Sequence, residues 1–313
     1  MIVRTYHGGD EAQIIALWNR TLVRDPITSQ VFYHKVLLDP NFDPGGVFVA
    51  VDQDKILGYI QAVVRRVPLG TDYEPDLGWI TALMVDRGVQ RQGLGSQLLD
   101  HALRYLKGHG RSRVEFSPYA PFYVVPGVDR VGYPGAIEFF QSHGFSVQYS
   151  PVAMDKGLVD FIMPQDVQQH IELLDRQGVV IEPISPPFYA RLFEFCDREF
   201  YADWSRSLRE ALALAIDPSQ LLICREGDTV LGFALFGAYD GHLERFGPFG
   251  VAEAERGRGL GKALLYQALQ TMKQRGCHSA WFLWTGERSP AGYLYYRAGF
   301  QVTRRFDILE KSL

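Results

Sequence analysis

The sequence is poor in the residues that mark several classes of protein. Only three cysteines occur in 313 residues, Cys196, Cys224 and Cys277, and their odd number and wide spacing indicate neither a disulfide framework nor a zinc site. We expect buried thiols in a reducing compartment. The eight histidines are scattered without metal-ligand spacing, so we expect no metal centre.

Positive charge and long apolar runs are also scarce. The formal net charge is −4, whereas proteins that bind nucleic acid usually carry a basic surplus. No stretch approaches the ~20 apolar residues of a membrane span, and the first residues lack the apolar centre of a signal peptide. We therefore expect a cytoplasmic protein whose partner is a small molecule, with neither nucleic acid nor a membrane as a partner.

One sequence motif occurs twice in the chain. The segment QRQGLGSQLL at residues 90–99 matches RGRGLGKALL at residues 256–265, an offset of 166 residues. The same offset relates Val85 to Val251, and the shared register extends to Gly110. A long register at one offset indicates duplication of a whole structural unit.

Matches outside this block need a different offset. Gly144-Phe145 corresponds to Gly299-Phe300, so the first copy is longer than the second. The extra residues fall in a Pro-rich segment at 118–135, where prolines favour turns. This segment is either a solvated loop, a lid over a substrate or a contact between domains.

Each copy predicts the same order of strands and helices. Residues 47–67 are rich in β-branched side chains around a polar turn and predict an antiparallel hairpin, and residues 79–85 predict a central strand. Residues 95–108 place leucines on one face of a helix, and residues 261–275 do the same in the second copy. Residues 163–178 predict a helix that links the copies.

A glycine-rich loop stands between strand and helix in both copies. Glycine lets successive N–H groups point inward, and the helix that follows adds the positive end of its dipole, which suits a diphosphate. A dinucleotide fingerprint would need a third glycine at Leu98 or Lys262, and a Walker loop would need Ser or Thr at Ala263. Both nucleotide motifs therefore fit poorly, and an ordinary tight turn remains the alternative.

The two loops resemble the Q/R-x-x-G-x-G/A loop of the GNAT superfamily of N-acetyltransferases. The segment LYYRAGF at residues 294–300 is similar to the closing L-Y-x-x-x-G-F signature of that family. The resemblance covers nearly the whole chain. It implies two tandem acyl-CoA acyltransferase domains of the α/β class, at residues 1–160 and 161–313, each with a mostly antiparallel, twisted mixed sheet flanked by helices.

The resemblance also implies the cofactor, acetyl-CoA. In this family the loop amides hold the diphosphate of coenzyme A, and the pantetheine arm lies along the preceding strand, with the thioester near Val85 or Val251. The expected cofactor-binding residues are Val251, Arg256, Gly257, Arg258, Gly259, Leu260, Gly261 and Lys262 in the second copy and Val85, Gln90, Arg91, Gln92, Gly93, Leu94, Gly95 and Ser96 in the first.

The chemistry implied is direct attack of an amine on the thioester, followed by departure of the coenzyme A thiolate. A tyrosine often protonates that thiolate in the family, and alignment on Gly-Phe places Tyr295 at this position. The first copy has Phe140 there, which has no proton to give. Tyr295 is alternatively a packing residue, and Tyr123 or Tyr133 from the insertion is an alternative donor for the first copy.

Glu244, just before the strand of the second loop, is the candidate general base. The alternative is a solvated charge at the end of a strand. The corresponding region of the first copy offers Asp76. Arg256, Arg258 and Lys262 make the second loop more cationic than the first, which suits phosphate groups or, alternatively, a solvated helix start.

The leading hypothesis is an acetyl-CoA-dependent N-acetyltransferase whose second copy is catalytic and whose first copy is degenerate. The rival is a non-catalytic acyl-CoA-binding or scaffold protein, and a third reading has both copies turning over. The acceptor is a small-molecule or peptide amine that the sequence does not specify, because the fold is shared across many acceptors. The chain is a monomer or a homodimer.

Overall fold

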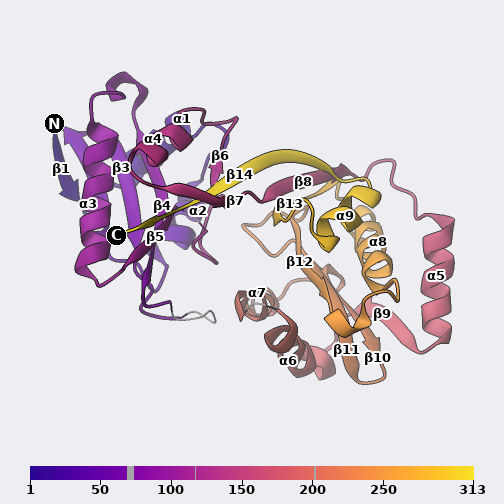
Figure 1. The fold of residues 1–313 in the computed structure, drawn as a ribbon. Coiled ribbons are helices and arrows are strands. Elements are labelled where there is room, and N and C mark those ends of the chain that lie inside the picture. The colour runs from indigo at the N-terminus through magenta and orange to yellow at the C-terminus, as the bar shows by residue number, and fades with distance from the viewer. Residues whose placement is uncertain (69–73, 117, 201) are drawn as a thin grey trace. The chain divides into compact units, whose positions relative to one another are not determined.

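The same order of strands and helices occurs twice in the computed structural model, which describes residues 1–68, 74–116, 118–200 and 202–313 (Figure 1). The chain divides into two units of mixed α/β structure. Of the described residues, 1–68, 74–151 and 305–313 make up the first unit, and 152–304 make up the second. The boundary expected near residue 160 thus falls inside the second unit.

The first unit has a mostly antiparallel sheet. Strands β1 to β4 are antiparallel neighbours in chain order, and β5 lies parallel to β4. Its main elements are β1 (Ile2–Thr5), α1 (Glu11–Thr21), α2 (Ser29–Phe32), β2 (Val47–Asp52), β3 (Lys55–Val63), β4 (Leu77–Val85), α3 (Leu94–Gly108), β5 (Arg113–Phe116), β6 (Val128–Asp129), α4 (Ala136–Ser142) and β7 (Ser146–Tyr149).

The second unit repeats this order after a linking helix. Strands β9 to β12 are antiparallel neighbours in chain order, and β13 pairs with β8. Its main elements are β8 (Val152–Gly157), α5 (Gln165–Arg176), β9 (Val179–Pro183), α6 (Tyr189–Glu199), α7 (Ala202–Ala213), β10 (Leu221–Glu226), β11 (Thr229–Phe236), β12 (Phe246–Val251), α8 (Leu260–Gln274), β13 (Ser279–Thr285), α9 (Pro290–Arg297) and the first residues of β14 (Gln301–Ser312).

Helices cover both faces of each sheet, because successive strand residues point to opposite faces. In β2, Val49 packs in the cluster that contains residues of α1, whereas Ala50 packs in the cluster of α3. In β10, Ile223 packs with α6 and Cys224 packs with α8. The buried runs of these strands follow from this two-sided covering.

The three cysteines are free and buried, as the sequence predicts. Within the described residues, no helix has the length and apolar character that crossing a membrane requires.

The glycine loops follow strands that leave their parallel neighbours. In the first unit, β4 pairs with β5 from Leu77 to Ile80, and the ladder between the described residues stops there. In the second unit, Arg245 forms a single parallel bridge with Trp281 just before β12 begins. A gap therefore opens between the two strands toward the loop in both units.

A β-bulge sits where each gap opens. Between Ile80 and Ala82, β4 carries one residue more than β3, and between Phe246 and Phe249, β12 carries one more than β11. A bulge bends the strand and increases its twist, which turns it away from its neighbour. Thr81 and Gly247 are thus equivalent, and their separation equals the loop offset of 166 residues.

The last strand of the chain completes the sheet of the first unit. In β14, Leu309 lies opposite Phe116 of β5 and Val147 of β7, and its side chain is fully buried. The strand after β7, which is β8, belongs to the second unit instead. Residues 305–313 therefore lie in the first unit, although the sequence assigns them to the second domain.

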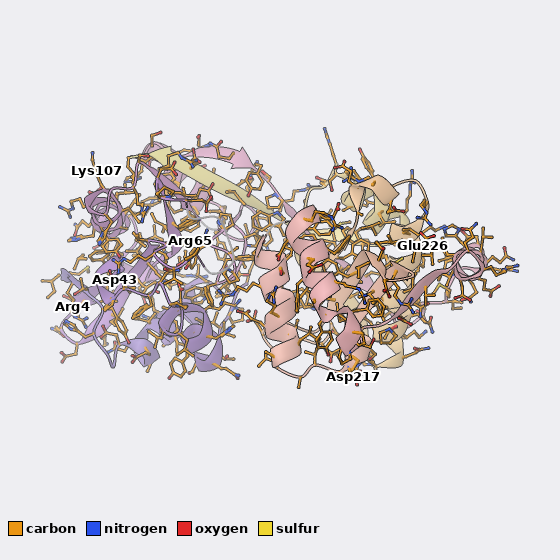
Figure 2. The ribbon with its side chains drawn as sticks, turned by 90° about the horizontal axis from the view of Figure 1, so that it is seen from below. Arg4, Asp43, Arg65, Lys107, Asp217 and Glu226 are labelled. Carbon is orange, nitrogen blue, oxygen red and sulfur yellow. The ribbon has the colours of Figure 1, made fainter. Side chains whose placement is uncertain are left out.

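The Pro-rich insertion at 118–135 packs onto its own unit. Arg65, labelled in Figure 2, is buried with its guanidinium 4.5 Å from the Trp79 ring centroid and 5.4 Å from that of Tyr119. It also donates a 3.0 Å hydrogen bond to the carbonyl of Ala120. Further along, Tyr133 donates to Asp25 at 2.6 Å. These contacts make the insertion an ordered part of the first unit.

We predict that Leu309→Ala destabilises the first unit by about 3 kcal/mol, because it leaves a cavity between β5, β7 and α3. Hydrogen exchange should become faster in β5 and stay unchanged in β13. The exposed Ser312→Ala in the same strand is the control. Equal loss of protection in both strands would contradict the assignment of residues 305–313 to the first unit.

Glu115 in β5 lies opposite Glu310 in β14 and beside Trp79 in β4. Burial and then the charges of Glu310 and Glu74 raise the pKa of Glu115 to about 7, from a usual value of 4.5. The folded chain therefore holds a proton between these two values that the unfolded chain has released. For this group, the free energy of unfolding must fall as the pH rises from 4.5 to 7.

We predict that Glu115→Gln removes this component of the pH dependence and makes the protein more stable than wild type at neutral pH. Urea unfolding at a series of pH values measures the effect. The prediction would be contradicted if the free energy of unfolding changed with pH in the same way for the wild type and for the variant between pH 4.5 and 7.

Candidate active site

The backbone of the two glycine loops has the same unusual shape. In the second unit, Gly257 and Gly259 have φ values of 90° and 76°, in the left-handed region that glycine tolerates. In the first unit, Gly93 has φ 82° and Arg91 has φ 62° at the position equivalent to Gly257. Arg91 thus holds a strained conformation, which the loop imposes on a residue with a side chain.

Both loops lead directly into long helices. Gly93 precedes α3, which starts at Leu94, and Gly259 precedes α8, which starts at Leu260. The free N–H groups of each first helical turn lie beside the loop, as a diphosphate site requires. The structure places the predicted loop residues together in two sets: Gln90, Arg91, Gln92, Gly93, Leu94, Gly95 and Ser96, and Arg256, Gly257, Arg258, Gly259, Leu260, Gly261 and Lys262.

The strand edge beside each gap carries outward-facing backbone groups. The backbone N–H of Asp86 donates to the carbonyl of Leu57 at 2.7 Å, and the backbone N–H of Ala252 donates to the carbonyl of Leu231 at 2.9 Å, each in the neighbouring antiparallel strand. Alternate residues of an antiparallel ladder face opposite sides, so the N–H and C=O groups of Val85 and Val251 point into the gaps. This is the orientation that an extended ligand chain would need to pair with either strand.

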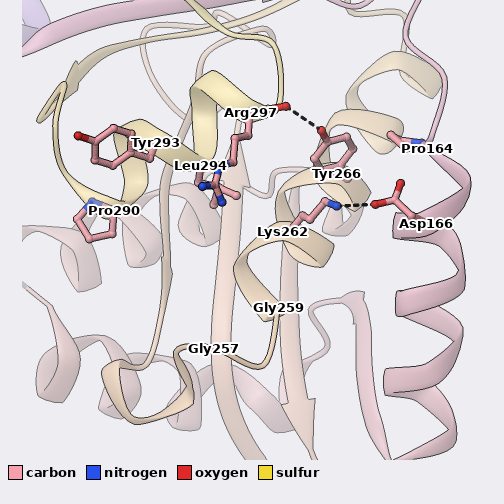
Figure 3. A pocket seen from close by; sticks show the side chains of 10 residues that line it. All are labelled: Pro164, Asp166, Gly257, Gly259, Lys262, Tyr266, Pro290, Tyr293, Leu294 and Arg297. Carbon is pink, nitrogen blue, oxygen red and sulfur yellow. Dashed lines mark hydrogen bonds and ion pairs between the residues drawn. The ribbon is translucent and has the colours of Figure 1, made fainter.

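A cavity of about 770 Å³ lies beside the second loop (Figure 3). It extends between the first turns of α8 and the length of α9 and reaches the beginning of α5. Tyrosine rings, prolines and cationic side chains form its walls, a composition suited to an aromatic base with phosphates. The lining residues are Pro164, Asp166, Gly257, Gly259, Lys262, Tyr266, Pro290, Tyr293, Leu294 and Arg297.

The cationic side chains of the second loop are paired with carboxylates. Lys262 contacts Asp166 at 2.7 Å, as Figure 3 shows. Arg258 pairs with Glu255 and lies 3.4 Å from Glu226 at the end of β10, labelled in Figure 2. An incoming phosphate would compete with these carboxylates for the two cationic side chains.

Tyr295 in α9 lies over the gap between β12 and β13. Its ring centroid is 6.1 Å from that of Phe249 in β12 and 4.5 Å from that of Phe282 in β13. Burial raises the pKa of Tyr295 above its usual value, so the phenol stays protonated at neutral pH. Among the described residues its hydroxyl has no hydrogen-bond partner. Tyr295 belongs to the hydrophobic core of the second unit and is not among the residues that line the cavity.

Phe140 occupies the same place in the first unit. Its ring lies 4.4 Å from Phe116 and 5.2 Å from Phe145, whereas the ring of Tyr295 lies 4.5 Å from Phe282 and 5.5 Å from Phe300. The two aromatic clusters match in position and spacing. The equivalence of Phe140 and Tyr295 therefore holds in three dimensions as well as in the alignment.

Side-chain hydrogen bonds span the region around the first loop. Gln90 donates a 2.9 Å hydrogen bond to the outward-facing carbonyl of Val85. His143 at the end of α4 lies 2.9 Å from the hydroxyl of Ser96 at the start of α3. The Phe139 ring stands 3.4 Å from the point where a Cβ on Gly95 would lie. The first cleft is thus bridged from α3 to α4.

The equivalent residues of the second unit leave its cleft open. Ser96 corresponds to Lys262, and His143 corresponds to Ala298, so the bridging pair is absent from this unit. Gln90 corresponds to Arg256, whose guanidinium pairs with Glu253 at 2.5 Å rather than with the strand edge. The difference between the clefts therefore depends on a few exchanged side chains.

Glu244 holds the start of β13. Its carboxylate accepts hydrogen bonds from the N–H groups of His278 at 2.8 Å and Ser279 at 3.2 Å, and from the Ser279 hydroxyl at 3.0 Å. Burial alone would raise its pKa, but these hydrogen bonds outweigh burial and the pKa lies below the usual value. A carboxylate so occupied is a poor proton acceptor, and Asp76 of the first unit is likewise paired, with Arg113 at 2.9 Å.

Several lining residues escaped the sequence prediction. Pro164 and Asp166 come from the linking helix, and Tyr266, Tyr293 and Arg297 come from the helices beyond the loop. The lysine expected at the loop is found with an acidic partner from another element. A comparison of the two copies at these positions, such as Tyr266 against Asp100, would have marked the second cleft as different.

A family model confirms the resemblance. The acetyltransferase (GNAT) family matches residues 13–145 and 189–300, which together make up more than half of the chain. The chain therefore belongs to the GNAT acetyltransferase family and carries two copies of its domain. Acetyl transfer is the general activity that this family supports.

Individual relatives are distant. The chain is 24% identical to a mycothiol acetyltransferase of Rhodococcus erythropolis over 269 residues, covering 81% of this chain and 80% of the relative. Among solved structures, the glucosamine N-acetyltransferase region of a fungal multi-domain β-N-acetylglucosaminidase has a TM-score of 0.82 at 21% identity, covering 99% of this chain and 38% of that protein. A tandem GNAT protein of the clavulanic acid pathway has a TM-score of 0.65 at 14% identity, with coverage of 99% and 98%. The TM-scores of the two solved structures show that the fold is shared.

We predict that calorimetric titration with coenzyme A gives one site per chain, because one of the two clefts is open. Gly259→Glu should abolish binding, since it places a bulky anion at a left-handed residue in the loop. Gly93→Glu, at the equivalent residue with nearly the same φ but no neighbour within 4 Å of an added Cβ, is the comparison variant and should leave the titration unchanged. Two sites per chain, or loss of binding in the control alone, would overturn the comparison of the clefts.

Proposed function

We propose that the second unit transfers the acetyl group of acetyl-CoA to an amine, with Tyr295 as the general acid, and that the first unit does not turn over. The observation that carries this proposal is the position of Tyr295. A protonated phenol without a protein partner lies over the strand gap of the unit whose loop opens on a cavity. The equivalent position beside the bridged cleft is Phe140.

The backbone of the gap supplies the binding groups in this proposal. The amides of residues 257–261 receive the diphosphate at the start of α8, and the edge of β12 at Val251 pairs with the pantetheine arm. Lys262 and Arg297, which line the cavity, suit the remaining phosphate of coenzyme A. These groups position the thioester between β12 and β13, below the Tyr295 hydroxyl.

The reaction is a direct displacement through a tetrahedral intermediate. The amine nitrogen forms a bond to the thioester carbon, and an outward N–H of β12 stabilises the oxyanion. The C–S bond then breaks, and the Tyr295 phenol gives its proton to the departing sulfur. The nitrogen loses its proton to water, which also restores the phenol. We assign Glu244 a structural role, because its oxygens are already bonded to β13.

We propose an amino sugar as the first acceptor to test. Two relatives carry the names mycothiol acetyltransferase and glucosamine N-acetyltransferase. On the face of the second sheet opposite α8, Phe200 and Trp204 stack with ring centroids 4.7 Å apart and are partly exposed. Aromatic rings of this kind provide an apolar surface with defined geometry, which suits the flat face of a sugar.

We predict that Tyr295→Phe lowers kcat by about 100-fold while the KM for acetyl-CoA stays within about twofold, because the hydroxyl acts only as the bond to sulfur breaks. Thiol release from acetyl-CoA is the measurement, with glucosamine as the first amine of a panel. Tyr296→Phe, which removes a hydroxyl bonded to Glu287 at the surface, should have no effect.

Full activity in Tyr295→Phe would refute the role of the phenol. A wild-type protein that binds coenzyme A but releases no thiol with any amine of the panel would instead favour the non-catalytic binding protein. Activity that survives Gly259→Glu and disappears in Gly93→Glu would place catalysis in the first unit and refute the proposal.

A further inference from the structure

Among the described residues, α5 precedes β9 in the second repeat, whereas β1 is the first element described in the first repeat. In the second unit α5 packs against α8, the helix that starts at the glycine loop. Its first residues, with Pro164 before them, form one wall of the cavity, and Asp166 contacts Lys262. One further residue of α5, His170, contacts the loop backbone itself.

His170 donates a hydrogen bond to the loop. Its Nε2 lies 3.0 Å from the carbonyl oxygen of Arg258. Because a carbonyl oxygen only accepts hydrogen bonds, Nε2 must carry the proton. The imidazole also fills the space beside Gly259, where an added Cβ would lie 2.4 Å from Nε2. The ring therefore contacts both residues of one peptide unit.

This contact fixes the direction of an amide that faces the cavity. In a planar trans peptide, the C=O of one residue and the N–H of the next point in opposite directions. The Arg258 carbonyl points toward His170, so the Gly259 N–H points away from α5. Gly259 is one of the residues that line the cavity. The imidazole thus aims the Gly259 N–H at the place that a diphosphate would occupy.

The first loop lacks this support. Nothing lies within 4 Å of the point where a Cβ on Gly93 would stand, although Gly93 has the same left-handed conformation as Gly259. The glycine turn therefore forms without a histidine. The loop of the second unit therefore does not need His170 to adopt its conformation. The contribution of His170 is to restrain the Arg258–Gly259 peptide unit.

We propose that His170 is a positioning residue for acetyl-CoA: it holds the Arg258–Gly259 peptide so that the Gly259 N–H binds the diphosphate. This inference rests on the proposed function, because it assumes that the second loop receives coenzyme A. His170 does not contact the reacting atoms, so its removal weakens binding and leaves the chemical step intact.

The test compares two side chains of similar size at position 170. His170→Leu fills the space without a donor, and His170→Gln keeps an N–H at a similar reach. Glu172→Ala, an exposed change on the same helix, is the control. Two acetyl donors are compared, acetyl-CoA and S-acetylpantetheine, which carries the thioester but no diphosphate.

We expect His170→Leu to raise the KM for acetyl-CoA and the Kd for coenzyme A by about tenfold or more, the loss of a hydrogen bond to a charged group. The kcat and all constants for S-acetylpantetheine should stay at the wild-type level. His170→Gln should restore most of the binding. If thermal melting shows that the leucine variant does not fold, His170→Asn, whose amide is too short to reach, replaces it.

An unchanged KM for acetyl-CoA in His170→Leu would overturn the inference. So would an equal loss with both donors, because that result indicates a structural role. Both outcomes require a wild-type protein that binds and uses acetyl-CoA. A wild-type protein that does neither refutes the proposed function itself, so the two failures are distinguishable.

Discussion

The separation of one strand from its parallel neighbour is the constraint on which the rest of this protein depends. A bulge at Gly247 turns β12 away from β13, and among the described residues no strand pairs with the outward N–H and C=O groups of Val251 on that side. Buried N–H and C=O groups need partners, so such an edge favours an extended ligand or water. The loop that follows brings helix amides to the same end, and the site is thus largely main chain.

Both copies of the duplicated domain can retain a binding site that consists mainly of backbone groups. The surrounding side chains then determine which copy can bind a ligand. Both copies retain the bulge, the left-handed loop residues and the helix start. They differ in what surrounds them: Ser96 and His143 are hydrogen-bonded beside the first loop, whereas the equivalent Lys262 and Ala298 form no such pair beside the second. Arg91 has a left-handed conformation that favours glycine, so the first loop keeps the backbone shape of the second although its sequence differs at this position.

The sequence predicts what is local and repeated. The shared register locates the loops, the helices that follow them and the outward Val85 and Val251, and Gly-Phe alignment pairs Phe140 with Tyr295. The remainder depends on contacts between distant segments that leave no periodic signal. The pairing of Leu309 with β5, the packing of residues 118–135 on their own unit and the contact of His170 with the loop belong to this group. The hydrogen bonds of Glu244 also join residues that are far apart in the sequence. Because the sequence does not reveal these partners, Glu244 is predicted to be a free carboxylate and a candidate base.

The most direct test of the central claim is a crystal structure of the protein with bound coenzyme A. We predict one molecule per chain, with its diphosphate on the amides of residues 257–261 and its sulfur within hydrogen-bonding reach of the Tyr295 hydroxyl. Coenzyme A on residues 91–95, or a sulfur atom remote from Tyr295, would contradict it.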